Sequence, residues 1–199
     1  MGSPPLKGKT IAFLVAQEGV EEVELTQPRE AVEQAGAVTH LVAPEAGEVQ
    51  AFKHLDRSAR FSVDRTLDDA TVEDSDGLVL PGGVANPDQL RLDSRAVGLV
   101  RDFAAAGKPI GVICHGPWTL VEADLLRGRR ITSWPSLETD IRNAGGDSVD
   151  EEVVVDDGLV SSRKPDDLPA FCEKIVAEFS EGVRASASQE RQAARAQPA

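Results

Sequence analysis

Residues 109–121 read Pro-Ile-Gly-Val-Ile-Cys-His-Gly-Pro-Trp-Thr-Leu-Val, and they contain the turn around which the rest of the chain is arranged. The apolar run 110–113 predicts a buried strand, and the segment from Pro117 predicts a helix, because proline fits the first turn of a helix. A strand that passes into a helix through so short a turn forms a tight elbow. We expect the apex side chain, Cys114, to stand exposed at the carboxyl end of the sheet.

Two interpretations of Cys114 follow from the residues. A thiol at a helix N-terminus is favoured as thiolate, which indicates a reactive nucleophile. Free cysteine is also among the most buried residue types, so spacing alone is equally compatible with a structural role. The elbow and the adjacent His115 favour the reactive thiol. In a helix-like turn His115 is not expected to reach back to the sulfur, and it would need an acidic group to orient it.

Composition limits the class of protein. The chain has 199 residues, enough for one well-buried domain, and 41% of them are hydrophobic. Its 21 basic and 34 acidic residues give a net charge of -13, which disfavours nucleic acid and anionic membranes as partners. No apolar run reaches the ~20 residues of a membrane span. Two cysteines and the absence of a signal-peptide pattern predict a reducing, cytoplasmic location.

Strands and helices alternate along most of the chain. The apolar run in 8–16, the helix pattern of 22–35 ended by Gly36, and the strand 38–42 form a βαβ unit. Further buried strands are expected at 77–80 and 110–113, and a helix at 93–106. The pattern predicts an α/β, three-layer flavodoxin-like sandwich with a mostly parallel central sheet.

Other segments mark excursions and boundaries. Residues 47–64 predict edge strands or a hairpin, and 151–162, with its Asp-Gly turn, predict a small antiparallel hairpin. A final helix is expected at 166–179, on which Cys172 has a packing or surface role. We expect a disordered leader at 1–7, one domain at 8–180 and a disordered tail at 181–199.

Three loops should converge at the carboxyl edge of this sheet. They are the acidic loop 17–22, the Pro81-Gly82-Gly83 turn and the Cys114 elbow. Together they would supply a carboxylate, backbone amides suited to developing negative charge, and a thiol. No metal site is predicted, because the three histidines are scattered without a ligand spacing.

Four motifs make the sequence similar to the PfpI family, the intracellular cysteine-peptidase-like branch of the class I glutamine-amidotransferase-like, DJ-one superfamily. The resemblance covers about residues 8–180. It rests on Ala16-Gln17-Glu18-Gly19-Val20-Glu21, Leu80-Pro81-Gly82-Gly83, Ile113-Cys114-His115-Gly116-Pro117, and Leu126-Arg127-Gly128-Arg129 followed by Thr132-Ser133-Trp134-Pro135.

The resemblance implies roles for particular residues. Cys114 would be the nucleophile, and Glu21 the carboxyl group hydrogen-bonded to it. Backbone amides would stabilise an oxyanion, those of Gly83 and His115 foremost, with Gly82 and Gly116 lining the site. An acidic residue of a neighbouring subunit would complete a Cys-His-acid triad.

The position that matches this acidic residue is Asp88, which is one methylene shorter than the glutamate of the peptidase. An equally supported interpretation makes Asp88 a loop acid that caps the following turn. The triad would require a homodimer or a higher homo-oligomer.

The resemblance also implies a cofactor-free, stress-related cysteine hydrolase. Its substrates would be small carbonyl compounds, in a glyoxalase or deglycase reaction, or glycated proteins and peptides, in a deglycase or peptidase reaction. A different class is a non-enzymatic redox sensor or chaperone-like protein that cycles through oxidation of Cys114. A third is an inactive sandwich used only for oligomer contacts. The effect of Glu21→Gln on turnover and on peroxide reactivity would separate the first two.

Overall fold

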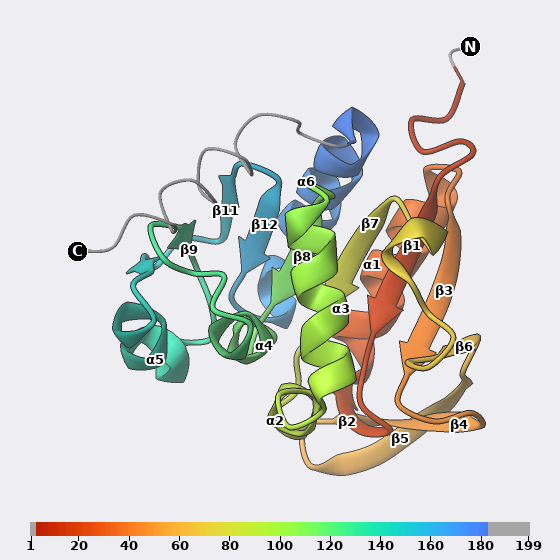
Figure 1. Cartoon of the computed structure of the whole chain (residues 1–199), viewed down its shortest axis with the longest axis horizontal. Coiled ribbons are helices and arrows are strands. Elements are labelled where there is room, and N and C mark those ends of the chain that lie inside the picture. The colour runs from red at the N-terminus through yellow and green to blue at the C-terminus, as the bar shows by residue number, and fades with distance from the viewer. Residues whose placement is uncertain (1–2, 183–199) are drawn as a thin grey trace.

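The structure, a computed structural model, describes residues 3–182. A seven-stranded sheet runs through the centre in the order β11-β12-β8-β7-β1-β3-β6 (Figure 1). Every neighbouring pair is parallel except β11 and β12, which form the hairpin predicted at 151–162. The strands are β1 (Thr10–Leu14), β3 (Val38–Ala43), β6 (Arg65–Thr66), β7 (Gly77–Leu80), β8 (Ile110–Ile113), β11 (Val153–Asp156) and β12 (Leu159–Ser162).

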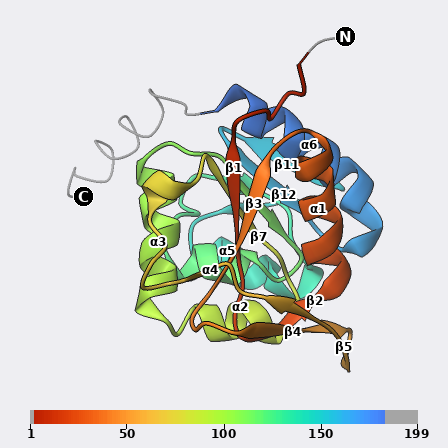
Figure 2. The same ribbon diagram turned by 90° about the vertical axis from the view of Figure 1, so that its right-hand side faces the viewer.

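Helices cover both faces of the sheet, which confirms the predicted three-layer sandwich. Figure 2 shows α1 (Glu22–Gln34) and α6 (Leu168–Glu181) on one side and α3 (Ser94–Ala105) on the other. Three shorter helices, α2 (Ala85–Leu90), α4 (Pro117–Glu122) and α5 (Glu138–Asn143), contribute Leu90, Leu120 and Ile141 to the core cluster on the α3 side. Single 3-10 turns occur at Val72–Asp74, Pro135–Leu137 and Pro165–Asp167.

The alternation of side chains along β1 produces the two layers of core. Ile11 and Phe13 point to the face covered by α1 and α6, where they pack with Phe171 of α6. Ala12 and Leu14 point to the opposite face and join the cluster under α3. Both sets are buried, as expected for a strand in the middle of a parallel sheet.

A second, three-stranded sheet contains the segment predicted as an acidic loop. Residues 18–21 form β2 (Glu18–Glu21), which pairs in parallel with β4 (Glu48–Lys53), and β4 pairs antiparallel with β5 (Asp56–Ser62). The hairpin predicted at 47–64 is confirmed, whereas the loop prediction for 18–21 is wrong because the edge of β4 supplies a partner strand. Short strands β9 (Arg130–Ile131) and β10 (Asp147–Ser148) form a third sheet.

The leader predicted at 1–7 and the tail predicted at 181–199 lie at the two ends of the described residues 3–182. Leu6 is fully buried and its N–H donates to Ala35 O at 2.9 Å, so the leader predicted as disordered is packed at this residue. Of the tail predicted at 181–199, only Glu181 and Gly182 are described, and the rest lies outside the described residues. Within residues 3–182 no helix has the length and apolarity needed to cross a membrane.

Candidate active site

The elbow holds Cys114 in a left-handed backbone conformation, with a φ of 62°. Such a conformation costs free energy for any residue other than glycine and persists only where its surroundings hold it. Two hydrogen bonds do so. Cys114 N–H donates to Ser162 O at 3.1 Å, and Trp134 N–H donates to Cys114 O at 2.9 Å. The strand–turn–helix element predicted from 109–121 is therefore present and is braced by two neighbouring segments.

The Pro81-Gly82-Gly83 turn follows β7 and lies against the elbow. A Cβ atom on Gly82 would clash with Glu24 Oε2 and would lie 2.6 Å from Cys114 Cβ, closer than atoms can approach. Gly82 N–H donates to Glu24 Oε2 at 3.0 Å. Glycine is thus required at position 82 because a carboxyl group and the cysteine both pack against its Cα atom.

The carboxyl group beside Cys114 is that of Glu24, and the prediction of Glu21 is wrong in this respect. Glu24 lies in the first turn of α1 and is completely buried. The Glu21 carboxylate instead accepts a hydrogen bond from His54 N–H at 2.9 Å, at the tip of the β4–β5 hairpin. α1 begins at Glu22, as predicted, directly after the strand formed by residues 18–21, and its buried face starts at Glu24.

The buried environment changes the protonation of this carboxyl group. Burial raises the pKa of Glu24 to about 8, the charge of Glu21 acts in the same direction, and the Cys114 thiol and the Gly82 amide oppose it. Glu24 is therefore protonated at neutral pH. Oε2 already accepts from Gly82, while Oε1 is buried and has no well-formed hydrogen bond to any described residue. The proton belongs on Oε1, which can donate it to a ligand oxygen.

This shift predicts how stability depends on pH. The folded chain retains the Glu24 proton between about pH 4.5 and 8, and the unfolded chain releases it, so stability falls as pH rises through this range. Relative to Glu24→Gln, the wild type should lose on the order of 3 kcal/mol of unfolding free energy from pH 5 to 9. Urea unfolding at pH 5, 7 and 9 measures this difference. Glu21→Gln should retain most of this pH dependence, because burial, the largest cause of the raised pKa of Glu24, is unchanged. Parallel curves for wild type and Glu24→Gln would contradict a buried protonated Glu24.

The thiol itself is buried, contrary to the expectation of an exposed apex. Cys114 is 6% exposed and packs in the cluster between the sheet and α1. Burial, and then the charge of Glu24, raise the pKa of the Cys114 thiol, while the amides of Gly83 and His115 lower it. A protonated Glu24 no longer repels the thiolate, so the thiol and the carboxyl group titrate as a pair. The preference for thiolate expected from the helix N-terminus is wrong, because burial, the largest cause, raises the pKa of this thiol.

His115 does reach the sulfur, contrary to the expectation from the sequence. Its Nδ1 lies 3.2 Å from Cys114 Sγ. Consecutive side chains of a helix diverge, but the left-handed backbone at Cys114 removes this pair from helical geometry. Burial lowers the pKa of His115, which favours the neutral imidazole that can accept the thiol proton.

Two tryptophans, the only ones in the sequence, enclose the imidazole. Trp134 stacks on His115 with ring centroids 5.6 Å apart, and Trp118 meets it edge to face at 5.4 Å. Trp118 Nε1 donates to Asp140 Oδ2 at 2.8 Å, which fixes the indole. The imidazole is therefore oriented by aromatic packing, with no carboxylate partner among the described residues.

Asn86 also supports the site, and the sequence analysis did not select it. The side chain is fully buried in α2. Its Oδ1 accepts from Ala16 N–H at 2.7 Å, and its Nδ2 donates to Pro81 O at 2.9 Å and Gly82 O at 3.1 Å. Asn86 thus ties the end of the segment after β1 to the glycine turn. The sequence around Asn86 has no hydrophobic periodicity that could have identified this residue as buried.

Three predicted site residues remain: Gly83, Gly116 and Asp88. The Gly83 amide lies beside the Cys114 sulfur, whereas the Gly116 N–H donates to Ile113 O at 2.9 Å and closes the elbow. The Gly116 amide is therefore occupied, which argues against its predicted place among the substrate-binding groups. Asp88 lies exposed in the first turn of α2, and its contribution to a neighbouring copy stays a prediction.

Together these features define a flavodoxin-like α/β sandwich with a cysteine at a strand–helix elbow. The chain belongs to the DJ-1/PfpI family, whose model matches residues 9–178. It is 43% identical over 164 residues to Protein/nucleic acid deglycase 2 of Escherichia coli (strain K12), which covers 82% of this chain and 93% of that protein. It is 42% identical over 166 residues to Deglycase PH1704 of Pyrococcus horikoshii, covering 83% and 96%.

Comparison with solved structures supports the same fold. The crystal structure of Drosophila melanogaster DJ-1beta superposes with a TM-score of 0.78 at 25% identity. The match covers 96% of this chain and 99% of that one. The resemblance to the PfpI family inferred from the motifs is confirmed.

Proposed function

We propose that the protein is a cofactor-free, cysteine-dependent enzyme that acts on reactive 2-oxoaldehydes and on their adducts with amino or thiol groups. The observation that carries this proposal is the surroundings of Cys114. A neutral imidazole nitrogen lies 3.2 Å from the sulfur, and a protonated, buried carboxyl group lies on the other side of Gly82. The two relatives named deglycases support the same class of reaction.

Addition to the aldehyde carbon is the first step. His115 Nδ1 accepts the thiol proton, and the Cys114 sulfur forms a bond to the carbonyl carbon. The carbonyl oxygen takes the proton of Glu24 Oε1, with the Gly83 and His115 amides stabilising the charge as it develops. The product is a hemithioacetal. With an adduct as substrate, the bond from this carbon to the amine nitrogen or thiol sulfur breaks as the bond to Cys114 forms, and the leaving group takes the proton of Glu24.

An internal redox step and hydrolysis complete the reaction. Glu24, left as a carboxylate by the first step, removes the proton from the former aldehyde carbon, and the electron pair passes to the neighbouring ketone. The ketone carbon then takes this proton back from Glu24, and the hemithioacetal hydroxyl proton moves by way of His115 to the ketone oxygen, which gives an alcohol. The former aldehyde carbon is then a thioester of Cys114. Water cleaves the thioester and restores the thiol, so that methylglyoxal and one water yield lactate. No external oxidant or reductant is needed.

Product analysis tests the proposal directly. Wild-type protein, incubated with methylglyoxal without added cofactor, should release lactate, and glycated N-acetylarginine or N-acetyllysine should yield lactate and the free amino acid derivative. Iodoacetamide treatment of a Cys172→Ala variant, in which Cys114 is the only thiol, should abolish both reactions. Cleavage of a fluorogenic peptide without any lactate would instead support the peptidase reaction.

A further inference from the structure

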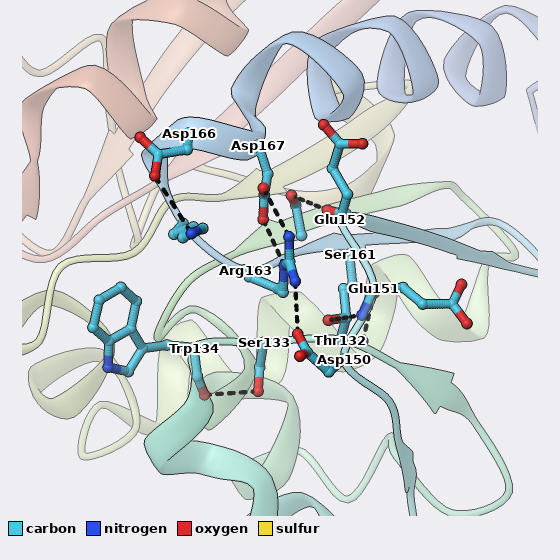
Figure 3. Close-up of polar contacts among 12 residues, drawn as sticks. Thr132, Ser133, Trp134, Asp150, Glu151, Glu152, Ser161, Arg163, Asp166 and Asp167 are labelled. Atoms are coloured by element: carbon cyan, nitrogen blue, oxygen red, sulfur yellow. Dashed lines mark hydrogen bonds and ion pairs between the residues drawn. The ribbon is translucent and has the colours of Figure 1, made fainter.

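Arg163, the residue directly after β12, joins two segments that flank the elbow. Its Nε and Nη2 donate to the Asp167 carboxylate at 2.8 and 3.1 Å, and its Nη1 donates to Asp150 Oδ1 at 2.6 Å (Figure 3). Asp167 is 4% exposed and immediately precedes α6. The planar guanidinium therefore connects the loop before β11 with the start of α6. We call these three residues the Arg163 bridge.

Further hydrogen bonds fix the segments on either side of this bridge. Ser162 Oγ donates to Glu152 O at 2.6 Å, and Thr132 N–H donates to Ser161 Oγ at 3.0 Å. Glu151 N–H donates to Thr132 Oγ1 at 3.4 Å. In Figure 3 these contacts connect the end of β12, the loop at 150–152 and the segment that leads to Trp134.

Both backbone hydrogen bonds of Cys114 end on this network. Its N–H donates to Ser162 O, the carbonyl group bonded directly to Arg163 N, and its C=O accepts from Trp134 N–H. The left-handed conformation at Cys114 must be held by such contacts. A shift of the Ser162–Arg163 peptide would change the direction of the Cys114 side chain.

We propose that the Arg163 bridge positions the Cys114 thiol between Glu24 and His115 by fixing the Ser162 carbonyl group. Arg163 and Asp150 are thus positioning residues, which act through the backbone and do not touch the substrate. As far as turnover is concerned, this inference rests on the proposed function. The reactivity of the thiol can be measured without any substrate.

Asp150→Asn separates positioning from electrostatics, because the two effects have opposite signs. Any electrostatic effect of removing this negative charge on the thiol would favour the thiolate and speed its alkylation. Loss of the tether to Arg163 would misplace the thiol and slow the attack, since small displacements of a reacting group cost large factors in rate. The Asp150 side chain is 79% exposed, so the substitution should leave the fold intact.

The experiment measures alkylation of Cys114 by iodoacetamide between pH 6 and 10, in a Cys172→Ala background. We expect Asp150→Asn to slow alkylation about tenfold and to lower kcat for methylglyoxal with little change in KM. Asp150→Glu should restore part of the alkylation rate. Arg163→Lys should slow alkylation, because a single ammonium group cannot replace a planar guanidinium that bonds to Asp167 and Asp150 at once.

Arg95 provides a matched control. It makes the same kind of bridge, to Asp93 at 2.7 Å and Asp68 at 2.9 Å, and these two acids do not take part in the hydrogen bonds of the elbow. Arg95→Gln should reduce thermal stability about as much as Arg163→Gln without slowing the alkylation of Cys114.

Two outcomes would overturn the inference. One is unchanged or faster alkylation in Asp150→Asn, and the other is an equal slowing in Arg95→Gln. If no carbonyl substrate is turned over but Asp150→Asn still slows alkylation, the proposed function fails and the positioning role stands. If methylglyoxal is turned over but Asp150→Asn does not slow alkylation, the proposed function stands and the positioning role fails.

Discussion

Cys114→Ala should abolish turnover of methylglyoxal while leaving the protein folded. In the proposed reaction the sulfur forms the covalent bond that makes the later steps possible, so no neighbouring group can replace it. We expect a loss of at least about 10³-fold in kcat/KM. Lactate formation measured at several substrate concentrations gives this ratio.

The stability of the same variant carries independent information. The sulfur is buried, but alanine removes only one heavy atom, and the expected cost is about 1 kcal/mol. Cys114→Gly should offset part of this cost, because glycine relieves the left-handed conformation at position 114. Thermal unfolding of both variants tests the geometry of the elbow.

Cys172→Ala is the control for these variants. Cys172 lies half-buried on α6 and makes no contact with the elbow that the structure records. Its substitution should leave turnover near that of the wild type. Retention of turnover by Cys114→Ala, or loss of turnover by Cys172→Ala, would contradict the assignment of the nucleophile.

Glu24→Gln should lower kcat by about 10² to 10³-fold, whereas Glu21→Gln should have little effect. Glutamine preserves the size of the side chain and the acceptor for Gly82 N–H, but it has no acidic proton to transfer from the position of Oε1. Since Glu21 bonds to His54 N–H, away from the sulfur, its substitution serves as a matched control. Steady-state kinetics of both variants at pH 7 measures the difference.

The pH profile of the wild type adds a second test of Glu24. Because the pKa of Glu24 is raised to about 8, the fraction that can donate a proton falls as pH rises past this value. The kcat of the wild type should therefore decrease as pH rises above about 8, and Glu24→Gln should not show this decrease. Equal losses in Glu21→Gln and Glu24→Gln would restore the role first predicted for Glu21.

The helical period of α1 contained a signal for Glu24 that the interpretation of the sequence did not use. Leu25, Pro28 and Val32 lie on the buried face, and Glu24 falls on the same face. The choice of Glu21 assumed that 17–22 is a loop that brings its acids to the elbow. The pairing of 18–21 with β4 depends on a segment about 30 residues away, so local sequence could not reveal it.

The order of apolar strands, the glycine turn after β7 and the elbow after β8 were determined by the sequence itself, because local periodicity and turn chemistry specify them. Tertiary structure alone decided which carboxyl group meets the sulfur, whether His115 reaches it and how Asn86 and Arg163 support the loops. These features depend on a positive φ at Cys114 and on contacts between distant segments. Burial then raises the pKa of Glu24, an effect that a sequence pattern does not contain.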